Sequence, residues 1–173
     1  KRVNQIIENV MQLSRRRATQ PEIIELSHWL PNFVNDYRDH SDATIDIHFQ
    51  CETKSISTRV DSSHLSQVMN NLMDNGLRYS ELGCGEKTLQ LECGTTAEAL
   101  PYIDVIDRGD GIAEDSLQHI FEPFFTTEAS GSGLGLYLSK QLCEANHADL
   151  SYSNPAGGDS RFRITFAHPD RIF

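Results

Sequence analysis

SSHLSQVMNNLMDNGLRYS, residues 62 to 80, is the stretch of sequence that decides the fold expected for this chain. On a helix that turns by about 100° per residue, its apolar side chains gather on one face. That face holds Leu65, Val68, Met69, Leu72, Met73 and Gly76. A narrow opposite stripe holds Gln67, Asn71, Asp74, Asn75 and Arg78. We therefore expect a helix over 62–79, capped by residues 61–63, with one face in the core.

The polar stripe of this helix has an unusual composition. Exposed helix faces favour Glu and Lys, whereas Asn is a mediocre helix former with a short amide side chain. An amide oxygen suits Mg²⁺, which takes a few oxygen ligands together with phosphate and water, so Asn75 is a candidate metal ligand. Arg78, one turn further on, has the planar fork that binds phosphate oxygens. Taken alone, the stripe is equally compatible with a solvated helix face.

Periodicity on either side of this helix predicts the other elements. Strands are expected at 22–26, 44–50, 55–60, 88–93, 102–106 and 161–166. The strand at 55–60 is expected to pair with the one before it. Further helices are expected after residue 26, with Pro31 near the first turn, and over 114–119 and 133–146. The fold class is α+β: a two-layer sandwich in which a mixed sheet of about five strands is covered on one face by about three helices.

Residues 102–112, YIDVIDRGDGI, predict an apolar strand that ends in a loop with two glycines. Gly109 and Gly111 allow a sharp turn and a close approach of a flat ligand to the backbone. A carboxylate at the mouth of such a pocket accepts a hydrogen bond from an exocyclic amine, the group that separates adenine from guanine. Asp107 is therefore a candidate adenine-binding residue. The alternative is an ordinary Asp-Gly loop between two elements.

A second glycine-rich segment, GSGLGL at 131–136, leads into a predicted helix. The N–H groups and the positive dipole end of a helix N-terminus bind anions without cationic side chains. The segment matches neither a Walker loop nor a dinucleotide fingerprint. Between the glycine clusters, FEPFFTTE at 121–128 places aromatic anchors before a small polar segment, as in a hinged lid. The alternative places Phe124 and Phe125 simply in the core.

Composition limits the classes of function. The 173 residues suit one domain, and 25 Asp and Glu against 15 Lys and Arg give a net charge of −10. Nucleic-acid binding needs a basic face, so no nucleic-acid partner is expected. The absence of an apolar run of about 18 residues predicts no membrane contact by this chain. Four dispersed cysteines are expected to be free thiols: Cys51, Cys84, Cys93 and Cys143.

Residues 1–17 differ from the rest of the chain, because they carry five basic residues and a single Glu. Their apolar residues recur at the a/d spacing of a helix packed on a partner helix: Val3, Ile6, Val10 and Leu13. The alternative is an ordinary amphipathic helix. Since the pattern starts at Lys1 without an initiator Met, the chain is expected to be a piece of a longer protein. We expect a domain boundary at 18–21.

In this order, the segments resemble the ATP-binding catalytic domain of bacterial sensor histidine kinases, in the GHKL or Bergerat-fold superfamily. The matched segments are the N box at 71–79, the G1 box at 107–111, the F box at 121–127, the G2 box at 131–136 and a last box at 157–162. Gly76 stands where Ala is usual, and Ser160 stands in the place of a usual Thr. The resemblance covers about residues 22–168 and implies a Bergerat fold.

The resemblance implies binding of ATP and Mg²⁺ by particular residues. Asn75 corresponds to the metal ligand and Asp107 to the residue that binds adenine. Asn71 and Arg78 correspond to residues that contact the phosphates during transfer. The other implied nucleotide-binding residues are Tyr79, Gly109, Gly111, Ile112, Phe124, Thr126, Thr127, Gly131, Ser132, Gly133, Leu134, Gly135, Leu136, Lys140 and Ser160. Arg78 and Lys140 are the matched cations, because the lid segment 128–130 contains neither Arg nor Lys.

Position 71 separates two activities within the superfamily. ATP-hydrolysing members resemble one another in a Glu four residues before the metal Asn, where it activates water. An amide cannot take a proton from water, so Asn71 favours phosphoryl transfer to another acceptor. The family's acceptor is a His followed by Glu or Asp on a dimerisation helix bundle, and none of the seven His residues fits that context. We therefore expect this chain to bind Mg-ATP without phosphorylating itself.

On this resemblance, residues 1–17 end the dimerisation and phosphoacceptor bundle, 18–21 form a linker and 22–173 form the ATP-binding catalytic domain. IIENVMQLSRRR at 6–17 and HWLPNFVNDY at 28–37 resemble more narrowly the PilS-type kinases, which control type IV pilin transcription through an NtrC-like response regulator. This implies the cytoplasmic domain of a homodimeric parent anchored in the inner membrane. Two alternatives share the fold: a non-catalytic nucleotide sensor or ATP-gated clamp, and a serine kinase of the anti-sigma type.

Overall fold

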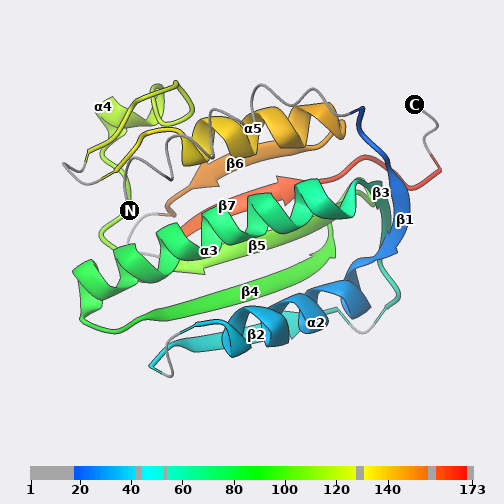
Figure 1. Ribbon diagram of the computed structural model, residues 1–173, viewed down its shortest axis with the longest axis horizontal. Helices are drawn as coiled ribbons and strands as arrows, with labels where there is room; N and C mark the ends of the chain where they lie inside the picture. The colour runs from blue at the N-terminus through cyan, green and yellow to red at the C-terminus, as the bar shows by residue number, and fades with distance from the viewer. Residues whose placement is uncertain (1–17, 42–43, 53, 128–130, 156–158, 171–173) are drawn as a thin grey trace.

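The structure is a computed structural model that describes residues 18–41, 44–52, 54–127, 131–155 and 159–170, and it has two layers (Figure 1). A five-stranded sheet has the order β2-β4-β5-β7-β6. Its strands are β2 (Asp46–Cys51), β4 (Thr88–Thr95), β5 (Pro101–Asp107), β6 (Asp149–Ser153) and β7 (Ser160–Thr165). One pairing is parallel and three are antiparallel, so the sheet is mixed.

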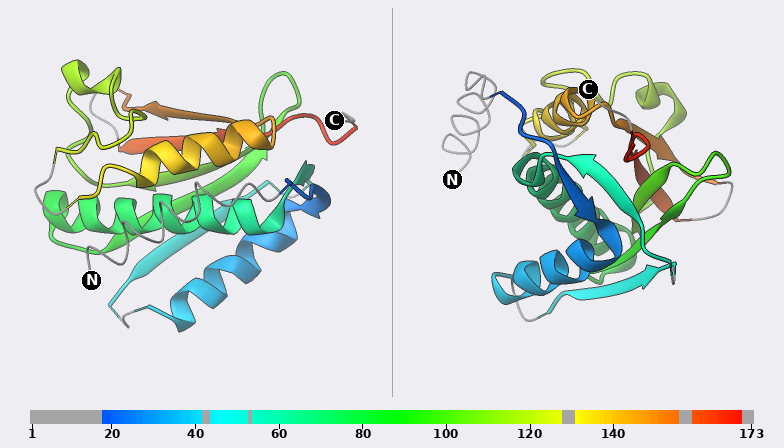
Figure 2. Two further views of the ribbon diagram at one scale, coloured as in Figure 1. Left: turned by 45° about the horizontal axis from the view of Figure 1, so that its top comes forward. Right: turned by 90° about the vertical axis from the view of Figure 1, so that its right-hand side faces the viewer.

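Three helices cover one face of this sheet (Figures 1 and 2). They are α2 (Leu26–Asp39), α3 (Ser62–Cys84) and α5 (Gly135–Ala145), and a short α4 (Glu114–Leu117) precedes α5. The expected α+β sandwich is therefore confirmed. The predicted helix and bundle segment at 1–17 lies outside the described residues. None of the described helices is both long enough and apolar enough for a membrane crossing.

One predicted strand pairing is wrong. The segment at 55–60 forms β3 (Ser57–Val60), which pairs antiparallel with β1 (Glu22–Glu25) in a separate two-stranded sheet. β2 pairs instead in parallel with β4. Parallel neighbours need a long crossover connection, and here β3 and α3 form it. Because the paired residues are far apart in the chain, alternation within each strand cannot reveal which partner it takes.

Two further local features differ from the sequence pattern. Pro31, expected near the first turn of its helix, is the sixth residue of α2, because the helix begins at Leu26, directly after β1. The Leu26 N–H donates to the carbonyl of Ile56 at 2.7 Å, which fixes this early start. The sequence pattern does not predict the edge strand β6. Its sequence, DLSYS, is short, polar and mostly exposed, so it carries a weak strand signal.

The long helix α3 has the two faces that its sequence predicts. All six residues expected on its apolar face are buried. Asp61 caps the helix by accepting hydrogen bonds from the Ser63 and His64 N–H groups, as expected. Burial opposes ionisation of Asp61, but the N–H groups of Gln20 and His64 and the Ser63 hydroxyl together lower its pKa to about 2. The cap therefore stays charged at neutral pH and stabilises the N-terminus of the helix.

Gly76 lies where α3 packs against β4 of the sheet. A Cβ at this position would lie 2.5 Å from Cδ2 of Leu89 and 3.5 Å from Cβ of Asp107. Leu89, on β4, is 2% exposed and fills the space that a methyl group would occupy. The glycine therefore allows α3 to lie close to the sheet beside Asp107.

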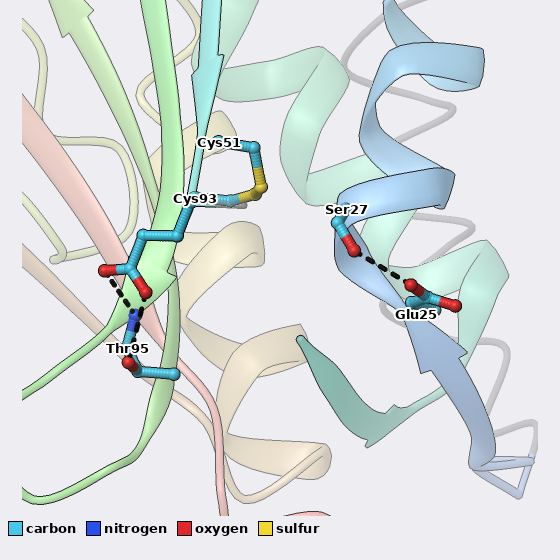
Figure 3. The surroundings of a disulfide bond; sticks show 6 residues. Glu25, Ser27, Cys51, Cys93 and Thr95 are labelled. Atoms are coloured by element: carbon cyan, nitrogen blue, oxygen red, sulfur yellow. Dashed lines mark hydrogen bonds between the residues drawn. A yellow bond between two sulfur atoms is a disulfide. The ribbon is translucent and has the colours of Figure 1, made fainter. Parts of the chain in front are cut away.

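The prediction of four free thiols is wrong for Cys51 and Cys93, which form a disulfide between β2 and β4 (Figure 3). The parallel register places these two residues directly opposite one another, with Cα atoms 4.7 Å apart. Because the register depends on the crossover through α3, the spacing of the cysteines in the sequence does not indicate it. Cys84 is a free, exposed thiol and Cys143 a free, buried one.

The face of the sheet opposite the helices carries a buried carboxylate. Asp104 on β5 is fully buried and accepts hydrogen bonds from Arg161 at 2.9 Å and from Nε and Nη2 of Arg163 at 2.7 Å each. Arg163 also lies 4.0 Å from the ring centroid of Tyr102. The hydrogen bonds to Asp104 raise the pKa of Arg163. A charge removed from water is tolerated here because two guanidinium groups compensate it.

Candidate functional site

A cavity of about 670 Å³ lies between α3, the loop that follows β5 and the N-terminus of α5. Most of the ligand residues expected from the sequence line it. They are Asn71, Asn75, Arg78, Tyr79, Asp107, Gly111, Ile112, Thr126, Thr127, Gly131, Ser132, Gly133, Gly135, Leu136 and Ser160. Segments that are far apart in the chain therefore converge on one site, in the size range of small-molecule pockets.

Four expected ligand residues lie outside the lining. The ammonium group of Lys140 donates to Asp149 at 2.9 Å and to the Leu150 carbonyl at 3.0 Å, so it faces β6. Leu134 is 1% exposed and Phe124 is 70% exposed, so one lies in the interior and the other at the surface. Gly109 packs its backbone against Tyr79. The lining of the cavity therefore contains none of these four residues.

The Asp107 side of the cavity, formed by Asp107, Ile112, Tyr152 and Ser160, is built on the sheet. Asp107 ends β5 and is 3% exposed. Its carboxylate accepts the Gly109 N–H at 2.8 Å and the Ser160 hydroxyl, from the paired residue on β7, at 2.6 Å. Burial raises the pKa of Asp107, although these two hydrogen bonds oppose the shift. This side therefore presents an oriented carboxyl group in a shielded position.

The Asn75 side of the cavity is built on helices. It is formed by Asn71, Asn75, Arg78, Gly131, Ser132, Gly133 and Gly135. Asn71 Nδ2 donates to the Gly135 carbonyl at 3.4 Å and to Ser139 Oγ at 3.3 Å, which links α3 to α5. Nη2 of Arg78 donates to Asn75 Oδ1 at 3.4 Å. These contacts are long for hydrogen bonds and are correspondingly weak. This side therefore combines amide groups, a cation and a glycine backbone.

The glycine at position 133 is required by the path of the chain. Its φ is +67°, and a Cβ there would lie 2.4 Å from the carbonyl carbon of Phe124. The Phe124 N–H donates to the Gly133 carbonyl at 2.8 Å, so the F-box segment and the start of α5 are packed backbone to backbone. The lid residues 128–130, expected to hinge here, lie outside the described residues. Phe125 is partly buried against the core, as its alternative interpretation expected.

Sequence reasoning missed several residues of the lining: Asp74, Ala113, Ser116, Ile120, Phe125, Tyr152 and Phe162. Asp74 had a signal, because it belongs to the predicted polar stripe of α3. Its carboxylate accepts the Tyr37 hydroxyl hydrogen bond at 2.5 Å, and burial raises the pKa of Tyr37, with Asp74 adding to the rise. For Tyr152 the sequence carries no such signal, because its pattern does not predict β6. Only the strand pairing brings its ring to the cavity.

The fold and this cavity together define a nucleotide-binding domain of the α+β class. The model of the histidine kinase-, DNA gyrase B- and HSP90-like ATPases matches residues 60–170. The chain belongs to that family. The superfamily and the fold expected from the sequence are thereby confirmed.

The relatives of the chain are sensor kinases. It is 47% identical to the sensor protein kinase PilS of Pseudomonas aeruginosa over 173 residues, which are 99% of this chain and 33% of that protein. It is 27% identical to the C4-dicarboxylate transport sensor protein DctS of Rhodobacter capsulatus, over 98% of this chain and 26% of that protein. The chain therefore spans a third or less of these two relatives.

Solved structures share the fold. Full-length ShkA in complex with AMPPNP superposes with a TM-score of 0.75 at 21% identity, covering 96% of this chain and 37% of that one. The Acinetobacter baumannii histidine kinase AdeS superposes with a TM-score of 0.72 at 24% identity, covering 97% of this chain and 79% of that one. At this level of identity the likeness concerns the fold. The family assignment itself indicates that the cavity binds ATP.

Proposed function

We propose that this chain is the catalytic unit of a two-component sensor histidine kinase, which transfers the γ-phosphoryl group of ATP to a His on a dimerisation domain. One observation carries the proposal: Asn71, on the Asn75 side, places an amide where an ATP hydrolase needs a general base. Asn71 donates its amide hydrogens to Gly135 and Ser139 on α5. Since an amide cannot take a proton from water, bound ATP keeps its γ-phosphoryl group for a nucleophile supplied by another domain.

The carboxylates among the described lining residues are both engaged by other groups. Asp107 accepts hydrogen bonds from Gly109 and Ser160. Asp74 accepts the hydrogen bond of the Tyr37 hydroxyl. Neither carboxylate is arranged as a general base for water. This supports phosphoryl transfer over hydrolysis.

Magnesium belongs to the proposal, because the donor set fits it. Asn75 places an amide oxygen in the lining, and the described residues contain no group of three or more His, Cys, Asp and Glu able to hold a metal. Such a site suits a cation that takes most of its ligands from phosphate and water. When bound, Mg²⁺ neutralises charge on the phosphate oxygens. Arg78 and the backbone N–H groups of Gly131, Ser132, Gly133 and Gly135 would bind the remaining phosphate oxygens.

Adenine recognition falls to the Asp107 side. An ionised Asp107 accepts a hydrogen bond from the exocyclic amine of adenine, a group that guanine lacks at that position. Ser160 and Gly109 hold the carboxylate in one orientation, so the acceptor is positioned before the nucleotide arrives. The carbonyl of guanine would face the same acceptor without a hydrogen to donate. The arrangement therefore selects adenine nucleotides.

The wider setting rests on the relatives. We propose that the parent is a homodimeric, membrane-anchored kinase with this domain in the cytoplasm, and that it phosphorylates an NtrC-like response regulator of type IV pilus genes. The 47% identity to the Pseudomonas aeruginosa sensor protein kinase PilS supports this proposal. Within it, residues 1–17 belong to the dimerisation bundle, 18–21 to the linker and 22–173 to the catalytic domain.

The test is phosphoryl transfer from γ-labelled ATP to a separately supplied dimerisation domain that carries the acceptor His. We expect acid-labile, Mg²⁺-dependent label on the supplied domain, none on this chain, and little release of phosphate when that domain is left out. A His→Gln variant of the supplied domain is the matched control. Nucleotide binding without transfer would favour a sensor or clamp, and acid-stable label on serine would favour a serine kinase; either result would contradict the proposal.

A further inference from the structure

The loop that follows β5 is held by side chains through its backbone N–H groups. The Arg108 N–H donates to Ser80 Oγ at 2.9 Å and the Gly109 N–H donates to Asp107. At the far end of the loop, the Ile112 N–H donates to the hydroxyl oxygen of Tyr152 at 2.9 Å. The loop contains no helix or strand, so these side chains determine its shape.

Tyr152 comes from the edge strand β6 and is placed by the sheet. It pairs with Phe162 on β7, and the two rings lie with centroids 5.0 Å apart and planes tilted by 58°. Phe162 is 6% exposed, and both residues line the cavity. The tyrosine ring is therefore held by packing, which fixes the position of its hydroxyl group.

At Gly111 the backbone of the loop that follows β5 packs directly against the end of β6. Its φ is +79°, and a Cβ at this position would lie 3.2 Å from the Tyr152 hydroxyl and 2.0 Å from Nδ2 of Asn154. The backbone therefore touches the end of β6 where a side chain would not fit. The next residue, Ile112, lines the cavity. A shift of the Tyr152 hydroxyl would move the Ile112 wall of the site.

We propose that Tyr152 is a positioning residue for the base of the nucleotide. Its hydroxyl oxygen accepts the Ile112 N–H and so fixes the backbone of Ile112. This sets the width of the pocket between Ile112 and Asp107. The hydroxyl group does not contribute to phosphate binding. This inference rests on the proposed function, because it assumes that the Asp107 side holds the base. It adds a residue on β6 that adjusts affinity for the nucleoside part of the ligand.

The test is the Tyr152→Phe variant, which keeps the ring on Phe162 and removes the acceptor for the Ile112 N–H. We expect the Kd for ADP to rise about three- to tenfold, the range of one neutral hydrogen bond, with an unchanged Kd for magnesium tripolyphosphate. In transfer assays the KM for ATP should rise by a similar factor with kcat unchanged. Tyr102→Phe is the matched control, because Tyr102 lies on the opposite face of the sheet and should leave both constants unchanged.

A second measurement needs no variant. Hydrogen exchange of the Ile112 amide should be at least about tenfold slower than that of the neighbouring Asp110 amide in the free chain, and slower again with ADP. An unprotected Ile112 amide, or an unchanged ADP affinity in Tyr152→Phe, would overturn the proposal. If the wild-type chain does not bind ADP at all while its Ile112 amide is protected, the proposed function fails and the loop contact stands. The two failures are therefore distinguishable.

Discussion

The two sides of the cavity differ in how firmly their polar groups are held before a ligand arrives. On the Asp107 side, strands fix the groups, and the hydrogen bonds to Asp107 and from Ile112 measure 2.6 to 2.9 Å. On the Asn75 side, helices supply the groups, and the contacts of Asn71 and Arg78 measure 3.3 to 3.4 Å. We therefore expect the Asp107 side to bind the base in a preformed pocket. The polar groups of the Asn75 side are expected to reach their final positions when the phosphate groups bind.

The largest expected effect is the loss of Mg²⁺-dependent phosphoryl transfer when the Asn75 side is altered. Asn75→Ala removes the amide oxygen proposed to hold Mg²⁺ and one hydrogen-bond acceptor of Arg78. Transition-state stabilisation by a bound metal is worth several kcal/mol. Phosphoryl transfer to a supplied dimerisation domain should fall by at least about 100-fold. Binding of adenosine should stay unchanged, because it lacks phosphate. Normal transfer by this variant would remove Asn75 from the metal site.

The next effect concerns recognition of the base. Asp107→Asn replaces a charged acceptor by a neutral amide, and a hydrogen bond to a charged group contributes about 1.5–3 kcal/mol. The Kd for ADP should therefore rise by roughly 10- to 100-fold, while its dependence on Mg²⁺ concentration stays as in the wild type. Calorimetric titration of ADP and GDP measures this. Equal loss of affinity for both nucleotides would contradict a role of Asp107 in selecting adenine.

The raised pKa of Asp107 gives a pH dependence with a defined sign. As the pH falls toward this raised value, the carboxyl group takes up a proton and ceases to be a charged acceptor, so ADP binding weakens. Its contribution to folding has the opposite trend: it is fully present below the unfolded pKa of about 3.9 and is lost as the pH rises through the folded value. Titrating ADP at a series of falling pH values, starting at neutral pH, tests the first statement. Asp107→Asn, which should lack this component, is the control.

The smallest effect concerns the orientation of the carboxylate. Ser160→Ala removes the hydroxyl that donates to Asp107 and leaves the charge in place. We expect a loss of about 1 kcal/mol, or roughly fivefold in the Kd for ADP, and a further rise in the pKa of Asp107. Ser160→Thr, which keeps the donor, should restore the affinity. A failure of Thr to rescue would mean that packing around β7, rather than the hydrogen bond, sets this side of the cavity.

Periodicity and residue chemistry predicted much of the site. The stripe on α3 gave Asn71, Asn75 and Arg78, because a helix places residues three and four apart on one face. The two glycine-rich segments gave the loop after β5 and the start of α5. The resemblance implies Phe124 as a ligand residue from its position in the F box and Lys140 as a matched cation, yet Lys140 bonds to β6 and Phe124 faces solvent. A position in a motif does not specify the direction of a long side chain.

By itself, the sequence determined the class of fold, the cap and faces of α3, and the family, because these depend on local spacing and residue type. The tertiary structure decided the parallel pairing of β2 with β4, the Cys51–Cys93 disulfide that follows from it, and the Tyr152 contact with the loop after β5. Each of these joins residues about 40 positions apart through a crossover or an edge strand. Such contacts arise from the packing of whole elements, and no local pattern records them.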